Sequence, residues 1–296
     1  MVSGKVAHMK APPFAYARAT SVDHALDMLS MHGEGAKLLS GGQSLLPAMN
    51  LRLMSPDIVI DIGDLTGLRG ISIQSDVIRI GALTRHVELL ESPEIARLAP
   101  LLAEAARHIA HPAIRNRGTI GGSLAHADPA AELPACMVVL DATIVVRARG
   151  GERRIAATDF FQGIFATALS ADELLVAVEL PIGRGPATYF FHEFARRHGD
   201  YALAGVAARA TSDAQVLSEV RMAFFGIADK PILAKAATSL INVRGTPERI
   251  SDAAEAFGRE LDPSEDQQAS ADLRRHLAKV LFRRCAETLL GFEPVL

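Results

Sequence analysis

Apolar positions in the first sixty residues alternate between strand spacing and helical spacing, with glycines between the segments. Ser21 is a suitable N-cap, and apolar side chains repeat at helical spacing after it until Gly33 and Gly35 interrupt the pattern. A later apolar run stops before Pro56, as a helix should. The pattern predicts a β-α-β-α unit made of a strand at 14–18, a helix from Ser21, a strand at 37–39 and a helix at 45–53.

The middle of the chain continues with β-branched strands and a further helix. Ser92 followed by Pro93 is a favourable N-cap and first-turn pair. We expect strands at 58–62, 77–80, 143–147 and 174–180, and a helix at 98–109. The stretch from Gly183 to Pro186 is the strongest linker signal. It predicts a boundary between a unit at 1–182, with subdomains of about 1–56 and 57–182, and a unit at 187–296.

The last third reads as three strands followed by three helices, without a glycine-rich loop. Strands are expected at 189–194, 202–210 and 216–225, and helices at 234–243, 250–261 and 273–289. Runs of strands followed by runs of helices are typical of α+β folds. We therefore predict an α+β protein.

Composition narrows the possible functions. The chain has 296 residues and a net charge of −3, and its Lys and Arg residues are scattered, so we expect no nucleic-acid partner. Neither a targeting pattern nor 18 uninterrupted apolar residues occur, which predicts a cytoplasmic protein without membrane insertion. Cys136 and Cys285 are the only cysteines, too few for an iron-sulfur cluster. Any redox chemistry must come from a bound group.

The first chemically informative segment is Ser40-Gly41-Gly42-Gln43-Ser44, between a predicted strand and a predicted helix. Glycines permit positive φ and close backbone approach, so such a turn can present N–H groups to an anion. The segment is neither G-x-G-x-x-G nor a P-loop. A tight turn without a ligand is the alternative interpretation.

The second segment runs from Asn116 to Ser123 and contains three glycines in five residues. We interpret it as a loop that offers backbone donors, with the hydroxyls of Thr119 and Ser123, to a phosphate. Arg117 could add a charge. Two such loops could hold one pyrophosphate from two sides.

Three segments together resemble a known family: LLSGGQSLLPAMNLRL, NRGTIGGSLAHADPAAELPA and RRHGDYALAG. In this order and spacing they are similar to the medium, FAD-binding subunit of the xanthine oxidase and carbon monoxide dehydrogenase family of molybdenum hydroxylases. The resemblance covers nearly the whole chain. It implies a vanillyl-alcohol-oxidase-type (PCMH-type) FAD-binding domain of two α+β subdomains, followed by a C-terminal domain of antiparallel strands and helices.

The resemblance also implies which residues contact FAD. Glu132 would lie near the ribityl chain and Tyr201 against the isoalloxazine ring. Glu193 departs from the family, because related chains often have Lys or Arg there; Arg196 or Arg197 could supply that cation, or could be surface or subunit contacts. The pyrophosphate side would be held by Ser40, Gly41, Gly42, Gln43, Ser44, Thr119, Ile120, Gly121, Gly122 and Ser123.

By the same resemblance, the chain is an electron-transfer subunit that takes electrons from 2Fe-2S clusters in a small subunit and passes them to an external acceptor. The small subunit is fed by a molybdenum centre in a large subunit, and the complex is expected to be a dimer of heterotrimers. FAD is the only cofactor expected in this chain, which needs no catalytic acid or base and no metal ligand. Two alternatives remain: a stand-alone FAD-dependent oxidase of the vanillyl-alcohol-oxidase type, and a flavin-free regulatory nucleotide-binding module.

Weaker signals have simpler interpretations. His108, His111, His126 and Asp128 gather around the second glycine segment, but their spacing matches no familiar zinc pattern. We expect His126 and Asp128 to order the loop through hydrogen bonds to the backbone. The arginine pairs are interpreted as solvated faces or subunit contacts: Arg153 and Arg154, Arg274 and Arg275, Arg283 and Arg284.

Overall fold

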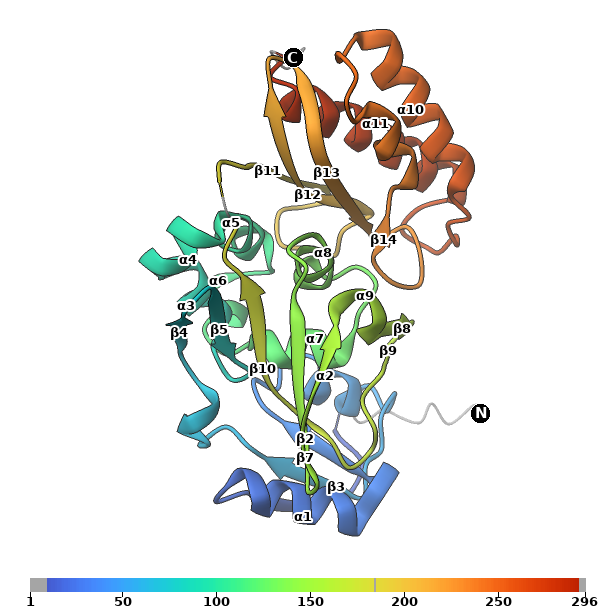
Figure 1. Cartoon of the computed structure of the whole chain (residues 1–296). Coiled ribbons are helices and arrows are strands. Elements are labelled where there is room, and N and C mark those ends of the chain that lie inside the picture. Colours follow the sequence, from blue (N-terminus) through green and yellow to red (C-terminus); the bar gives the residue numbers. More distant parts are fainter. Residues whose placement is uncertain (1–9, 184, 293–296) are drawn as a thin grey trace, which may run out of the picture.

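The computed structural model describes residues 10–183 and 185–292, which form three regions stacked in chain order (Figure 1). The N-terminal region lies at one end, a five-stranded sheet with helices in the middle, and the C-terminal region at the other end. Residues 1–9, part of the segment searched for a targeting signal, and Arg184, within the predicted linker, lie outside the described residues.

The N-terminal region is a small parallel sheet in the order β1-β3-β2. Ser21 caps the first helix as predicted, since its side chain accepts the His24 N–H, and Gly33 ends that helix with φ of 51°. The second helix is shorter than predicted because Arg52 adopts a left-handed conformation, with φ of 59°. The elements are β1 Ala15–Arg18, α1 Val22–His32, a 3-10 turn Gly33–Gly35, β2 Ala36–Leu39, α2 Leu45–Asn50 and β3 Ile58–Asp61.

The middle sheet is antiparallel, in the order β4-β5-β10-β6-β7. Its strands are β4 Ile71–Gln74, β5 Val77–Gly81, β6 Thr143–Ala148, β7 Gly151–Ala156 and β10 Leu174–Pro181. The two edge strands were not predicted, because an exposed edge lacks a clear apolar alternation: in β7 only Ile155 is buried. Arg153 and Arg154 lie on this edge and form ion pairs with Glu173 and Glu179.

Helices cover one face of this sheet. Ser92 caps α4 as predicted, and the predicted helix at 98–109 begins only at Pro100 because Ala99 is not helical, with φ of −142° and ψ of 55°. The middle region also contains a 3-10 turn Thr66–Leu68, α3 His86–Glu91, α4 Pro93–Leu98, α5 Pro100–His108, α6 Pro112–Arg115, α7 Ile120–His126, α8 Glu132–Val139, α9 Ala157–Phe160, β8 Phe161–Gly163 and β9 Ala166–Thr167.

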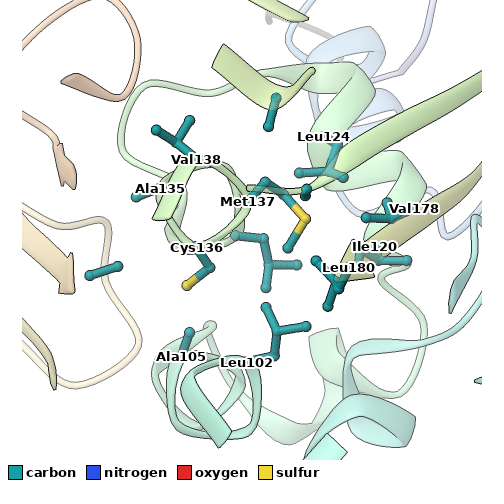
Figure 2. Close-up of a cluster of buried hydrophobic side chains, with 14 of the residues drawn as sticks. Leu102, Ala105, Ile120, Leu124, Ala135, Cys136, Met137, Val138, Val178 and Leu180 are labelled. Atoms are coloured by element: carbon teal, nitrogen blue, oxygen red, sulfur yellow. The ribbon is translucent and has the colours of Figure 1, made fainter. Parts of the chain in front are cut away.

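Helix α8 is buried on all sides and connects the middle and C-terminal regions. Every residue from 133 to 139 is buried, and the helix contacts α5 and the C-terminal sheet. Figure 2 shows Cys136 and Met137 of α8 among side chains of α5, α7 and β10. Such a helix fixes the two regions relative to each other, because separating them would expose an apolar surface.

The C-terminal region is a four-stranded antiparallel sheet in the order β11-β12-β13-β14, with two helices packed on it. Phe224 of the sheet packs against Phe257 and Phe282 of the helices, with ring centroids 4.3 and 6.4 Å apart. The elements are β11 Thr188–Phe194, β12 Ala204–Asp213, β13 Val216–Phe225, β14 Ile232–Leu233, a 3-10 segment Lys235–Leu240, α10 Pro247–Glu260 and α11 Ala271–Leu289.

Two predictions for the C-terminal region were wrong. The helix expected at 234–243 is a 3-10 segment, because Asn242 has φ of 57° and donates its N–H to the Leu217 carbonyl oxygen at 2.8 Å, which holds the chain against β13. Arg274 is not a solvated side chain. It is 7% exposed, donates to the Leu203 carbonyl oxygen at 2.8 Å and pairs with Asp266.

Three apolar cores follow the three regions, and the middle sheet belongs to two of them. Alternate residues of its central strands point to opposite faces. Val145 and Val176 pack with the N-terminal region, whereas Val146 and Leu175 pack with α5, α7 and α8. Among the helices in the described part of the chain, none is both long and apolar enough to cross a membrane.

Candidate functional site

A cleft with a volume of about 660 Å³ lies where the N-terminal and middle regions meet. Both glycine segments line it, together with the residues 199–201 that precede β12. Of the twelve residues predicted to contact FAD, eleven line this cleft: Ser40, Gly41, Gly42, Gln43, Ser44, Thr119, Gly121, Gly122, Ser123, Glu132 and Tyr201. The structure thus brings together segments up to 161 positions apart (201 − 40).

The first glycine segment is an open loop whose backbone donors are unused. Within residues 10–183 and 185–292, no acceptor is found for the N–H groups of Gly41, Gly42, Gln43 and Ser44. Gly42 has φ of 73°, which favours glycine. Gln43 braces the loop by donating its side-chain amide to the Gly41 carbonyl oxygen at 3.0 Å. This loop can therefore donate several N–H groups to an anion in the cleft.

The second glycine segment differs from the predicted loop, because Ile120 begins helix α7. Thr119 caps the helix, accepting the Gly122 N–H at 3.1 Å. The remaining N–H groups also have partners: Ile120 donates to the Thr84 carbonyl oxygen, Gly121 to that of Ala82 and Ser123 to that of Thr119, at 2.8–3.0 Å. These four N–H groups are engaged within the chain, in contrast to the prediction that they are offered to a phosphate.

Glycines of the second segment serve close packing. A Cβ on Gly121 would lie 2.6 Å from the Ala82 Cβ and 2.8 Å from the Ala82 carbonyl oxygen, so α7 reaches the end of β5 only with glycine there. Ile120 does not line the cleft; it is fully buried in the middle core beside Leu124 (Figure 2). What this segment offers to the cleft is chiefly the hydroxyls of Thr119 and Ser123.

The two segments touch each other. A Cβ on Gly41 would collide with the carbonyl oxygen of Arg117 and lie 2.9 Å from the Gly118 Cα. Beside this contact, the Thr119 hydroxyl donates to the Ser40 Oγ at 3.2 Å. The cleft wall therefore depends on a glycine at position 41 and on one hydroxyl pair.

Glu132 stands at the start of α8, in the cleft wall. Burial raises the pKa of Glu132 to about 8, and the nearby carboxylates of Glu193 and Asp128 add to the effect. The side chain is therefore mainly protonated at neutral pH, which makes it an O–H donor instead of an anion.

Glu193, where related chains often carry a cation, pairs with His108. The Glu193 Oε1 lies 3.6 Å from the His108 Nδ1, and this contact raises the pKa of His108. Arg196 donates to the Gln268 carbonyl oxygen at 2.8 Å, and neither Arg196 nor Arg197 lines the cleft. The basic side chain next to Glu193 is thus a histidine from α5.

Tyr201 is the residue of the third segment that offers an aromatic ring. It lines the cleft and is 71% exposed, so its ring is available to a ligand. Gly199, with φ of 87°, turns the chain against His111 just before it. An exposed aromatic ring at the rim of a cleft suits stacking on a planar group.

Sequence reasoning missed several cleft residues, among them Lys37, His86 and Phe165. Lys37 lies on β2, only three positions before the first glycine loop. This closeness in sequence was the one signal that could have identified it. His86 and Phe165 come from segments without a motif, so nothing in the sequence marked them. Asp128 orders its turn as predicted, accepting the Ala130 N–H at 2.9 Å. Within the described residues, no group of three His, Cys, Asp or Glu side chains could hold a metal ion.

The cleft fits FAD chemically. Its volume lies within the roughly 300–1,000 Å³ typical of cofactor sites. Unused N–H groups at 41–44 suit a diphosphate, hydroxyl and carboxyl donors suit a ribityl chain, and Tyr201 suits an aromatic ring system. His86 adds a buried imidazole without a hydrogen-bond partner, which a ligand can satisfy.

Comparison with known proteins supports this interpretation. Residues 12–183 match the family described as FAD binding domain in molybdopterin dehydrogenase, and residues 189–289 match the CO dehydrogenase flavoprotein C-terminal domain. The nicotine 6-hydroxylase medium subunit of Paenarthrobacter nicotinovorans is 41% identical, over 93% of this chain and 97% of that protein. The glyceraldehyde dehydrogenase medium chain of Sulfolobus acidocaldarius is 35% identical, over 97% of this chain and all of that one.

A solved structure shares the whole fold. The carbon monoxide dehydrogenase of Hydrogenophaga pseudoflava, described as lacking the Mo-pyranopterin moiety of its molybdenum cofactor, contains a chain that matches with a TM-score of 0.92 at 35% identity. The match covers 94% of this chain and 98% of that one. Cleft, fold and both sequence matches agree: the chain belongs to the family of FAD-binding medium subunits of molybdenum hydroxylases.

Proposed function

We propose that this chain carries electrons within a heterotrimeric molybdenum hydroxylase, taking them from 2Fe-2S clusters of a small subunit and passing them to an external acceptor. The redox chemistry is supplied by FAD when it is bound, whereas the protein positions and tunes it. Cys136 and Cys285 are both buried and far apart in sequence, so clusters must belong to another chain. A large subunit would hold the molybdenum cofactor and bind the substrate.

One observation carries the proposal: an open glycine loop with four unused N–H groups faces the same cleft as Glu132 and Tyr201. We propose that residues 40–44 donate to the FAD pyrophosphate, with the Thr119 and Ser123 hydroxyls beside them. Protonated Glu132 would donate to the ribityl chain, and Tyr201 would contact the isoalloxazine ring. Gly121, Gly122 and Ile120 would support the site by holding α7 in place.

The names of the relatives support a division of labour between subunits. One is named after nicotine, another after glyceraldehyde and a third after carbon monoxide, yet all resemble this chain over more than 90% of its length. A chain that selected the substrate would be expected to vary with it. We therefore propose that the large subunit selects the substrate.

We also propose a division into an FAD-binding unit at 1–182 and a C-terminal unit at 187–296. The C-terminal sheet and helices have their own apolar core, and the two family matches meet between residues 183 and 189. The dimer of heterotrimers and the cytoplasmic location stay predictions from the sequence.

The test is to purify the chain alone and together with candidate large and small subunits, and to measure flavin absorption, iron and molybdenum. The proposal expects a yellow chain that, in the complex, carries iron and molybdenum in its partners, with flavin reduction by substrate only in the complex. A colourless chain that takes up no added FAD would favour the regulatory module. A flavoprotein that oxidises an organic substrate without any partner would favour the stand-alone oxidase.

A further inference from the structure

His86 packs against Gly118, where the second glycine segment touches the first. It is the first residue of α3, and its backbone N–H donates to the Gly118 carbonyl oxygen at 3.0 Å. A Cβ on Gly118 would lie 2.9 Å from the His86 Cε1 and Nδ1, so the imidazole packs directly against the second segment. The side chain is 6% exposed and contributes to the lining of the cleft.

Neither ring nitrogen of His86 forms a hydrogen bond of good geometry among the described residues, although the ring lies close to the Thr119 backbone. Burial lowers the pKa of His86 to about 4; the nearby Thr119 backbone opposes this effect, and the Arg115 guanidinium adds to it. The imidazole is therefore neutral at physiological pH, with one N–H donor and one acceptor nitrogen. A buried polar group left without partners is costly, which indicates that something outside the chain satisfies it.

The other buried atoms without a partner are of a different kind. In the described residues they belong to Glu193, Arg221, Arg274 and Arg283. Each of these side chains has another polar contact, such as Arg221 with Asp141 and Glu193 with His108. None of the four lines the cleft. Of these five side chains, only His86 has all its polar atoms among those without a partner, and only His86 lines the cleft.

We propose that His86 is a positioning residue for the dinucleotide, donating one ring N–H to an oxygen of the diphosphate or of the ribityl chain. The inference rests on the proposed FAD site. Because the imidazole is held by Gly118 and the start of α3, it reaches the cleft from the side of the second segment. It also supplies a donor on the side where the backbone N–H groups of residues 120–123 are already paired.

Two pairs of variants with matched shapes test the inference. His86→Asn and His86→Leu differ in polarity near the Nδ1 position, and His86→Gln and His86→Met do so near the Nε2 position. In at least one pair, we expect the polar variant to bind FAD about tenfold more tightly than the apolar one, equivalent to about 1.4 kcal/mol. In the apoprotein the order reverses: the apolar member has the higher melting temperature, since it removes a buried group without a partner.

ADP serves as a second ligand, because it contains the diphosphate without the flavin and ribityl chain. A loss of affinity for both ADP and FAD places the contacted oxygen in the diphosphate, and a loss for FAD alone places it in the ribityl chain. A direct readout is the ¹⁵N NMR signal of the His86 ring, assigned by its disappearance in His86→Asn. FAD should shift this signal.

Equal FAD affinity within both pairs, in a wild-type chain that binds FAD, would overturn the role of His86 and leave the flavin site standing. A wild-type chain that binds no FAD would overturn both.

Discussion

The two glycine segments that form the cleft look alike in sequence and differ in structure. At 40–44 the chain is an open loop with a left-handed Gly42 and unused N–H groups. At 119–123 the chain is a capped helix start, and the N–H groups of residues 120–123 are all paired within the protein. Glycine in the first segment leaves donors available to a ligand, whereas glycine in the second allows two backbones to meet.

This difference teaches that a glycine-rich segment is not by itself a phosphate site. A Cβ at either Gly41 or Gly121 would collide with neighbouring atoms. At Gly41 these atoms belong to the other glycine segment, whereas at Gly121 they belong to Ala82 at the end of β5. We therefore expect substitutions in the first segment to affect mainly FAD affinity and those in the second to affect mainly stability.

The largest effects are expected from Gly41→Ala and Gly121→Ala. Gly41→Ala should raise the FAD dissociation constant about tenfold or more, because the added Cβ meets the backbone of residues 117 and 118 and overpacking costs about 1–3 kcal/mol. Gly121→Ala should lower the free energy of unfolding by about 1–3 kcal/mol for the same reason. FAD titration and thermal melts measure the two effects. Gly67→Ala, with no atom within 4 Å of the added Cβ, is the control.

The opposite result would contradict the proposed difference between the two segments: Gly41→Ala lowering only the free energy of unfolding, and Gly121→Ala lowering only the affinity for FAD.

Glu132, just beyond the second segment, should show its effect in the pH dependence of the apoprotein. Its pKa is about 8 in the folded state and 4.5 in the reference state, so between these values the unfolded chain releases a proton that the folded chain keeps. The contribution of Glu132 to the free energy of unfolding should therefore fall as pH rises from about 4.5 to about 8, at up to about 1.4 kcal/mol per unit. Glu132→Gln should remove this slope, as denaturant titrations at several pH values would show. An unchanged slope in the variant would contradict the assignment.

His86 gives the opposite slope on the acid side. Its pKa is about 4 when folded and 6.5 in the reference state, so between these values the unfolded chain binds a proton that the folded chain does not bind. The contribution of His86 to the free energy of unfolding should fall as pH decreases from about 6.5 to about 4. In the wild type this contribution opposes that of Glu132 between about pH 4.5 and 6.5, so the two are separated by comparing the variants. The same titrations of His86→Asn should lack this acid slope while retaining the alkaline one, whereas loss of both slopes would point to a general loss of structure.

The pair of hydroxyls that joins the two segments, Thr119 and Ser40, should contribute less to the free energy of unfolding. Thr119→Val removes the cap of α7 and the hydrogen bond to Ser40, and should lower the free energy of unfolding by about 1 kcal/mol. Thr119→Ser keeps both hydrogen bonds and should restore most of the stability. A Val variant as stable as the wild type would show that the joint does not depend on this hydroxyl.

Tyr201 lies outside both segments and should give the smallest change when only its hydroxyl is removed. No hydrogen bond involves that hydroxyl in the described residues, so Tyr201→Phe should alter FAD affinity by less than about threefold. Tyr201→Ala removes the ring and should weaken binding by about 0.5–1.5 kcal/mol. Equal binding by the Ala and Phe variants would exclude a contact of the ring with the flavin.

Much of the framework could be predicted because apolar periodicity dominates the buried elements. The strand at Leu174–Pro181 and the cap at Ser21 follow from local patterns. Edge strand β7 could not be predicted, because its arginines are paired with Glu173 and Glu179 of distant sequence segments. The segment at 234–243 resembled a helix locally, but its pairing with β13 decided its conformation.

The site was predictable where a motif marks it and unpredictable where packing creates it. Residues 40–44 carry their chemistry in their own backbone, so sequence and structure agree there. The helix start at Ile120 depends on Thr84 and Ala82, whose carbonyl oxygens accept the N–H groups, and no local pattern reveals this. His86 gains its significance only from burial against Gly118.

Amide hydrogen exchange with and without FAD tests the central claim most directly. In the apoprotein, the amides of residues 41–44 should exchange fast and those of 120–123 slowly, because only the latter are hydrogen-bonded within the chain. Adding FAD should slow exchange at 41–44 and leave 120–123 nearly unchanged. If FAD binds while the amides of 41–44 continue to exchange at the rate of the apoprotein, the first loop does not hold the diphosphate and the account is contradicted.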